Sequence, residues 1–236
     1  MIYRIWLERN NRLFQQQKTT PTEGVLQQII QDTRCRFDGS VTPVSDTSCA
    51  RDFFHRWKIK VMYSMRKTSL HSWLCPPSSS IAINCDGSVK NNMGGYGTIA
   101  RDHMGRVRFA VAGGSRTSNV LRMELRAIRC GLEKACSAGY PRVHIRSDSL
   151  CAIQMVKNIF HTPWHCMDLV DDILNLKERF HCCTFTHVMR EANYCADYLA
   201  SFIRANQELS FSTECLPLAL YHLVREDARG RKYQRL

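Results

Sequence analysis

The chain has 236 residues, of which 44% are hydrophobic and 23% are charged, a composition that excludes a wholly disordered protein. This length fits one domain with appendages or two small domains. The formal net charge of +12 is spread along the sequence and favours a partner that carries phosphates. We expect neither a membrane protein nor a secreted one, because no apolar run reaches a membrane span and no signal-peptide core opens the chain.

The twelve cysteines contain no C-x-x-C pair, and several fall within apolar patterns where a free thiol packs as a small hydrophobic group. A disulfide framework or a zinc site would call for paired spacing. We therefore expect reduced cysteines, no zinc, and an intracellular protein, either nuclear or cytoplasmic.

The first 80 residues indicate helices followed by a linker. Residues 1–37 contain two amphipathic segments, IWLERNNRLF and VLQQIIQDTRCRF, separated by the helix breaker TTPTEG. Residues 38–80 contain the turn-rich stretches DGSVTPVSDTS and PPSSS. We predict a helical extension over 1–37, a linker over 38–80 and a domain boundary near residues 76–80.

From residue 81 onward the pattern becomes that of a mixed α/β domain. Turn residues and apolar runs predict five strands, at 81–86, 96–102, 106–113, 142–148 and 183–188. Apolar stripes predict four helices, at 119–137, 149–158, 167–180 and 192–203. The order of elements predicts an α/β fold over 81–204, with a mixed sheet and helices packed on it. Residues 205–236 are expected to form a tail, with a helix in ECLPLALYHLVRED as an option.

Four carboxylates fall where such a sheet would bring them together. Asp86 and Asp148 each end a predicted strand, while Glu124 and Asp197 border the buried stripes of two helices. Each has a purely structural explanation: a turn, a helix cap, or a charge at the edge of a stripe. Gathered at one edge, however, like charges repel and call for a cation, and oxygen ligands suit Mg²⁺ or Mn²⁺.

Five motifs in this order resemble the type 1 ribonuclease H domain, in particular the plant form attached to the reverse transcriptases of non-LTR retroelements. They are D-G-S at 86–88, G-G-x-G at 94–97, M-E-L at 123–125, S-D-S at 147–149 and R-E-A-N-x-x-A-D at 190–197. The resemblance covers residues 80–204. It implies a five-stranded mixed sheet with helices on both faces, and it places the family's carboxylates on Asp86, Glu124, Asp148 and Asp197.

The resemblance also implies a substrate and roles for these residues. The RNA strand of an RNA/DNA hybrid would be hydrolysed with two Mg²⁺ or Mn²⁺ ions, bridged by Asp86 and held by Glu124, Asp148 and Asp197. Glu124 would lie close to the ribose 2′-hydroxyl, which distinguishes RNA from DNA. Nucleic-acid contacts are expected from six residues: Gly87, Ser88, Asn119, Arg122, Arg190 and Asn193, the last of which is also expected to cap a helix.

Other readings stay open. The family's paired asparagines before the glutamate are matched only by Asn119, and no basic helical insertion lies between Ile159 and Cys182. An alternative is a catalytically weak or inactive domain that binds nucleic acid, and a retroelement relic without a selected role is a third. Residues 1–37 resemble the connector that follows a zinc-binding region in such polyproteins. We expect a monomer by default.

Overall fold

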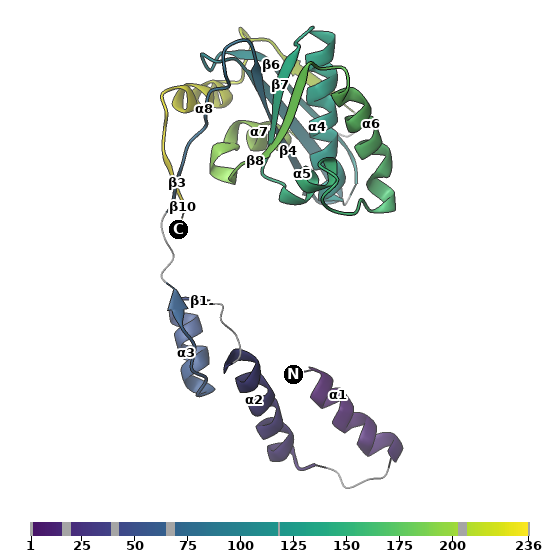
Figure 1. Ribbon diagram of the computed structural model, residues 1–236, viewed down its shortest axis with the longest axis vertical. Coiled ribbons are helices and arrows are strands. Elements are labelled where there is room, and N and C mark those ends of the chain that lie inside the picture. Colours follow the sequence, from purple (N-terminus) through teal and green to yellow (C-terminus); the bar gives the residue numbers. More distant parts are fainter. Residues whose placement is uncertain are drawn as a thin grey trace. The chain divides into compact units, whose positions relative to one another are not determined.

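The computed structural model describes residues 2–15, 20–38, 43–64, 69–117, 119–202 and 207–235. Predictions for the residues between these ranges, including the end of the helix expected at 192–203, lie outside the described residues. The chain divides into two compact units, Met1–Thr68 and Ser69–Arg235 (Figure 1). The second unit begins ahead of the boundary expected near 76–80, because Trp73 is buried within it.

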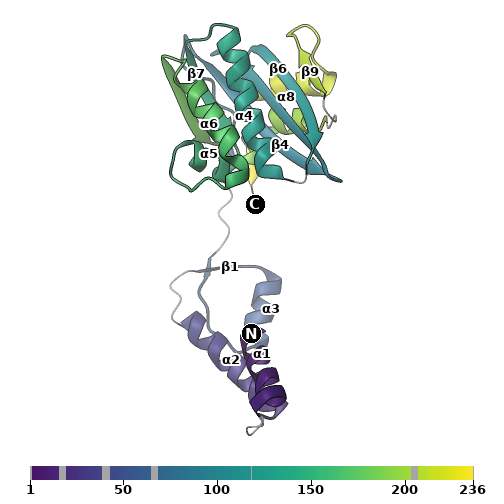
Figure 2. The same cartoon turned by 90° about the vertical axis from the view of Figure 1, so that its right-hand side faces the viewer.

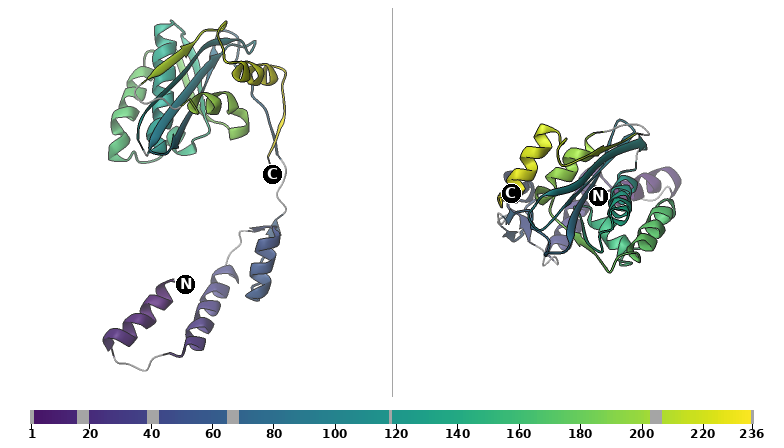
Figure 3. Two further views of the ribbon diagram at one scale, coloured as in Figure 1. Left: turned by 180° about the vertical axis from the view of Figure 1, so that it is seen from behind. Right: turned by 90° about the horizontal axis from the view of Figure 1, so that it is seen from above.

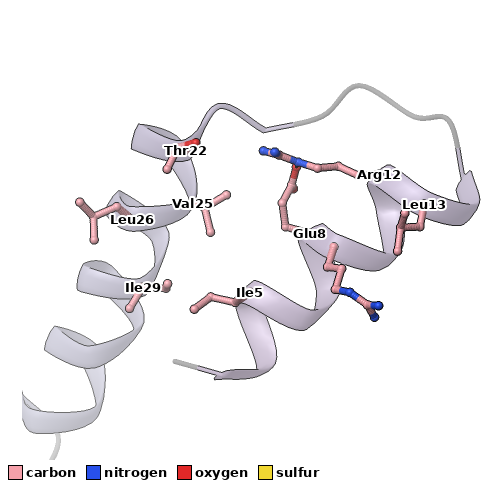
Figure 4. A pocket seen from close by; sticks show the side chains of 9 residues that line it. Ile5, Glu8, Arg12, Leu13, Thr22, Val25, Leu26 and Ile29 are labelled. Atoms are coloured by element: carbon pink, nitrogen blue, oxygen red, sulfur yellow. The ribbon is translucent and has the colours of Figure 1, made fainter.

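In the part of the first unit that the structure describes, there are three α-helices and a short pair of parallel strands. Its elements are α1 (Ile2–Asn10) with a π-helical turn (Asn11–Gln15), α2 (Thr22–Asp38), β1 (Val44–Ser45), α3 (Ser48–Arg56) and β2 (Tyr63–Ser64). Helix α3 lies in the segment expected to be a linker, and it begins where the Thr47 side chain accepts a hydrogen bond from the Ala50 N–H at 3.1 Å. An open cleft lies between α1 and α2, where Ile5 and Ile29 point toward one another (Figure 4).

The second unit is built on a six-stranded mixed sheet in the order β8-β7-β4-β5-β6-β9. The strands are β4 (Ile81–Lys90), β5 (Met93–Arg101), β6 (Val107–Arg116), β7 (Arg142–Ser147), β8 (Cys182–His187) and β9 (Glu208–Phe211). The β4–β7 and β7–β8 pairs are parallel and the other three are antiparallel. The prediction of five strands was one too few, because β9 pairs with β6 and extends the sheet at that edge.

Helices cover both faces of this sheet, as expected. The helices are α4 (Val120–Ser137), α5 (Leu150–Val156), α6 (Met167–Lys177), α7 (Tyr194–Ala200) and α8 (Leu218–Ala228). Figures 2 and 3 show α4, α5 and α6 on one face and α7 and α8 on the other. A cluster including Ile83, Leu125 and Ile145 fills the first layer, and one including Leu199 and Leu220 fills the second. Strand β4 is therefore buried on both sides from Ile81 to Gly87.

The segments on either side of the predicted domain also belong to the second unit. Strand β3 (Ser69–His71) pairs antiparallel with β10 (Tyr233–Arg235), close to α8 in Figure 1. Helix α8 buries Leu220 and Val224 against the sheet. The tail set apart at 205–236 thus contributes β9, α8 and β10 to the second unit. Among the helices of the described segments, none has the length and apolar character needed to span a bilayer.

Candidate metal-binding active site

The site lies where β4 continues beyond its neighbour β7. Their parallel pairing ends at Cys85 and Ser147, whereas β4 runs on to Lys90 alongside β5. The expectation that Asp86 ends the strand was therefore wrong: it is an interior residue opposite Gly97, one position past the last β7 contact. Asp148 follows the end of β7 directly, so both carboxylates emerge at the same gap in the sheet.

Glu124 reaches this gap from α4, which packs closely on β4 at Gly87. A Cβ atom at Gly87 would lie only 2.3 Å from the Glu124 backbone nitrogen, so any larger residue would push the helix away. The Gly87 backbone N–H donates to the Glu124 carboxylate. Ser147, which is fully buried, donates to Glu124 Oε2 at 3.4 Å. Gly87, one of the residues expected to contact nucleic acid, thus makes room for α4.

Three of the four predicted carboxylates form one cluster. Ligand oxygens of Asp86, Glu124 and Asp148 all lie within 4.8 Å of one another. Asp86 and Glu124 are only 5% and 7% exposed. Burial, followed by the charges of Glu124 and Asp148, raises the pKa of Asp86 to about 9. Burial and the charge of Asp148 raise the pKa of Glu124 to about 8. The cluster is thus strained electrostatically when it carries its full negative charge.

Asp197, the fourth predicted carboxylate, lies outside the 4.8 Å cluster but close enough to affect it. Its charge adds to the rise in the pKa of both Asp86 and Glu124. Helix α7 carries it and packs tightly on β5, because a Cβ at Gly97 would lie 2.5 Å from the Ala196 carbonyl oxygen. Arg190 Nη2 pairs with Asp197 Oδ1 at 3.1 Å at the surface. Asp197 therefore borders the site and is partly neutralised.

Asn193 occupies the predicted N-cap position of α7, but its side chain is not exposed where nucleic acid could contact it. The residue is fully buried, and its side chain makes no capping hydrogen bond. Its Nδ2 instead donates to the Cys85 carbonyl oxygen at 2.9 Å and to Asp148 Oδ1 at 3.0 Å. The Asn193 side chain thus holds the Asp148 carboxylate from inside the protein.

The other residues expected to contact nucleic acid have partners within the domain. Ser88 Oγ donates to the Ala200 carbonyl oxygen at 2.7 Å and so fixes the end of α7. Asn119 caps α4 by accepting from the Arg122 N–H at 3.1 Å. The Arg122 guanidinium pairs with Asp168 at 2.9 Å and donates to the His165 carbonyl. These contacts give Ser88, Asn119 and Arg122 structural roles.

The donor set fits hard divalent cations. It consists of carboxylate oxygens, which Mg²⁺ and Mn²⁺ prefer, and it opens at a gap in the sheet. Among the described residues, no lysine or arginine forms an ion pair with Asp86, Glu124 or Asp148. A like-charged cluster of this kind favours an external cation, because a bound cation reduces the repulsion between the carboxylates.

Sequence reasoning missed several supporting residues. Ser147 and Gly97 lie within the quoted motifs, but their contacts with Glu124 and α7 depend on the packing. Asn84 is a fully buried polar residue two positions before Asp86 on the same face of β4. The sequence did contain a signal for Asn84, which is a polar residue in an apolar run. A buried amide needs hydrogen-bond partners, so this position could have been predicted to join a buried polar network.

Comparison with solved structures shows the fold. The N-terminal RNase H domain of Rv2228c from Mycobacterium tuberculosis is 21% identical, with a TM-score of 0.50, over 52% of this chain and 91% of that chain. RNase H1 from the halophilic archaeon Halobacterium salinarum NRC-1 is 21% identical, with a TM-score of 0.50, over 52% of this chain and 95% of that chain. A comparison with curated proteins gives no significant match.

The family follows from the sequence span that carries the site. The profile of the reverse transcriptase-like family matches residues 84–203, which are 120 of the 236 residues. This span contains Asp86, Glu124, Asp148 and Asp197, together with strands β5 to β8 and helices α4 to α7. The chain belongs to the reverse transcriptase-like family and has the ribonuclease H fold.

Proposed function

We propose that the second unit is a ribonuclease H that hydrolyses the RNA strand of RNA/DNA hybrids with Mg²⁺ or Mn²⁺. The observation that carries this proposal is the convergence of Asp86, Glu124 and Asp148 within 4.8 Å at the gap between β4 and β7. Membership of the reverse transcriptase-like family and the ribonuclease H fold support the proposed reaction class.

The four carboxylates would divide the work by position. By the family resemblance, Asp86 would bridge two cations, Glu124 and Asp148 would also hold them, and Asp197 would lie at the border. Bound divalent ions supply an activated water and stabilise the leaving oxygen of a phosphodiester. The protein's own contribution is to bury Asp86 and Glu124, to hold Glu124 through Ser147 and Gly87, and to hold Asp148 through Asn193.

Binding of the hybrid would depend on exposed basic side chains. Arg122 and Arg190 have intramolecular partners, while Arg116 is exposed at the end of β6. We expect modest affinity that falls steeply as salt concentration rises, because phosphate contacts release counterions. A flat salt response would contradict phosphate-dominated binding. The origin in a plant non-LTR retroelement is also a proposal, and it rests on the motifs of the sequence.

A cleavage assay tests the proposal. The purified chain is incubated with a labelled RNA/DNA hybrid and Mg²⁺ or Mn²⁺, beside an Asp148→Asn variant. We expect cleavage of the RNA strand that Asp148→Asn reduces by about a thousandfold, since a metal-ion site is worth several kcal/mol in the transition state. An Asp172→Asn variant, altered at an exposed aspartate on α6, serves as the matched control and should cleave normally.

The same assay separates the enzyme from the alternative of a catalytically weak binding domain. A folded wild-type chain that binds the hybrid but leaves it intact with both metals would overturn the enzymatic proposal and support the alternative. Cleavage that persists in Asp148→Asn would instead show that the activity belongs to a contaminant or to another site.

A further inference from the structure

We infer that Asn193 is a positioning residue for Asp148, and that a buried polar network orients it through segments outside the family match. This inference rests on the proposed function for its catalytic meaning. Its members are Trp73, Asn84, Arg101, Asn193 and Asp227, and Trp73 and Asp227 lie outside residues 84–203. All five side chains are buried.

The network begins at the active site with an amide that uses both of its donor hydrogens. Asn193 Nδ2 donates to the Cys85 carbonyl oxygen at 2.9 Å and to Asp148 Oδ1 at 3.0 Å. Its Oδ1 accepts from Asn84 Nδ2 at 3.0 Å. Rotation of this amide by half a turn would point its oxygen at the Asp148 carboxylate, so its orientation decides whether Asp148 is held or repelled.

Asn84 determines that orientation. Its Oδ1 accepts from Trp73 Nε1 at 2.9 Å and from Arg101 Nη2 at 3.1 Å. Tryptophan and arginine side chains can only donate hydrogen bonds. The oxygen of Asn84 must therefore face these two residues, which turns its amide nitrogen toward Asn193. The direction of every hydrogen bond as far as Asp148 follows from this one constraint.

The flanking segments hold the two donors in place. Arg101 Nη1 pairs with Asp227 Oδ2 of α8 at 2.6 Å, and its guanidinium lies over the Trp73 ring at 3.9 Å. Tyr233 of β10 donates to Asp227 Oδ1 at 3.1 Å. The β3–β10 pair joins the segment that carries Trp73 to the end of the chain. The segment before the matched span and the helix after it thus both support the orientation of Asp148.

The experiment uses the full chain and two readouts. Crystal structures of the metal-free wild type and Asn193→Ala show whether the Asp148 carboxylate keeps its position, and calorimetric titration with Mn²⁺ gives the metal affinity. We expect Asp148 to turn away in Asn193→Ala and Mn²⁺ affinity to fall roughly 10-fold to 100-fold, as for other residues that orient metal ligands. Trp73→Phe keeps an aromatic ring beneath Arg101 and removes the indole N–H together with part of the buried ring volume, so we expect a smaller loss in the same direction.

A matched control separates positioning from general stability. Tyr96→Phe removes one hydroxyl that donates to Glu208 at 3.0 Å, in the same sheet but outside the network. It should leave Mn²⁺ affinity unchanged. If Asn193→Ala does not fold, Trp73→Phe supplies the same two readouts.

The outcomes for this inference and for the proposed function are distinct. An Asp148 carboxylate that stays in its wild-type position in the network variants overturns the positioning role, whatever the metal affinity. Equal losses of Mn²⁺ affinity in Tyr96→Phe and Asn193→Ala overturn it as well. A wild-type chain that binds no Mn²⁺ overturns the proposed function, while displacement of Asp148 in the metal-free variant would still support the positioning role.

Discussion

Two groups of buried charges in the second unit are balanced in different ways. Arg101 and Asp227 are nearly inaccessible to solvent, but they pair at 2.6 Å and share further hydrogen bonds with Asn84 and Tyr233. Asp86 and Glu124 are almost as deeply buried, yet the charges that raise the pKa of each belong to other carboxylates. The first group is neutralised within the chain, whereas the second calls for cations from outside.

This difference helps to distinguish buried charged residues that stabilise the fold from buried charged residues that form a binding site. A buried ion pair is satisfied by its partner, so removing one member leaves an uncompensated charge. In a cluster of like charges, the carboxylates repel one another and lack a partner of opposite charge. They stay close together only because the surrounding structure holds them there. Asn84 and Asn193 connect the two groups, so the satisfied pair helps to orient the unsatisfied cluster.

The largest effect is expected from breaking the buried ion pair. Asp227→Ala should lower the free energy of unfolding by about 3–5 kcal/mol, because it leaves Arg101 charged, buried and unpaired. Urea denaturation measures this change. Glu226→Ala on the same helix is the control, since Glu226 pairs with Arg231 at the surface and should cost no more than about 1 kcal/mol. Similar losses in both variants would show that the burial of the pair is not what matters.

Binding of a divalent cation should stabilise the carboxylate cluster. We expect Mg²⁺ or Mn²⁺ to raise the free energy of unfolding by about 2.7 kcal/mol when the free ion is at a hundred times its Kd. Thermal denaturation with and without the metal measures the shift, and a chelator should reverse it. The same titration of Asp86→Asn should give little stabilisation. A wild-type chain that is unaffected by either ion would contradict the assignment of this cluster as a metal site.

Neutralising the cluster by mutation should also stabilise the metal-free chain. Because the pKa of Asp86 is raised from 3.8 to about 9, its contribution to stability is fully present below its ordinary pKa and is lost as the pH rises toward about 9. At about pH 8, Asp86→Asn should therefore be more stable than the wild type by more than roughly 1.4 kcal/mol, the equivalent of one pKa unit.

Urea denaturation of the metal-free proteins at about pH 5 and about pH 8 measures this effect. The gain in the free energy of unfolding from Asp86→Asn should be larger at about pH 8 than at about pH 5. Only the wild type has an Asp86 proton to release when it unfolds, and this release becomes more favourable as the pH rises. Asp172→Asn changes an exposed aspartate and should show no such growth. A gain that is independent of pH would mean that side-chain packing, rather than charge, explains the stabilisation.

The smallest effect is expected at the border of the cluster. Arg190→Gln should lower the free energy of unfolding by about 0.2–1 kcal/mol, because its ion pair with Asp197 is exposed to solvent. Steady-state cleavage of the hybrid by the same variant tests the predicted nucleic-acid contact. A raised KM with unchanged stability would support that contact. An unchanged KM would contradict it and would indicate that the role of Arg190 is its ion pair with Asp197.

Periodicity and turn residues predicted most of the elements of the second unit. The helix over 119–137 is present as α4, and all five predicted strands exist, although β4, β5 and β6 are longer than expected. Strand β9 was missed because four residues at a sheet edge, half of them exposed, leave only a weak apolar pattern. Helix α3 was missed because its signal is a short cap at Thr47 within a turn-rich stretch.

The sequence by itself determined the mixed α/β class and the four carboxylates on which the proposed function depends, because local periodicity and short motifs carry that information. Only the tertiary structure decided that Gly87 makes room for α4, that Asn193 faces Asp148, and that Asp227 supports the site. Asn193 contacts Asn84 across 109 positions, and Asp227 contacts Arg101 across 126. No local pattern encodes such pairs, since they meet only when the sheet and its two helical layers have formed.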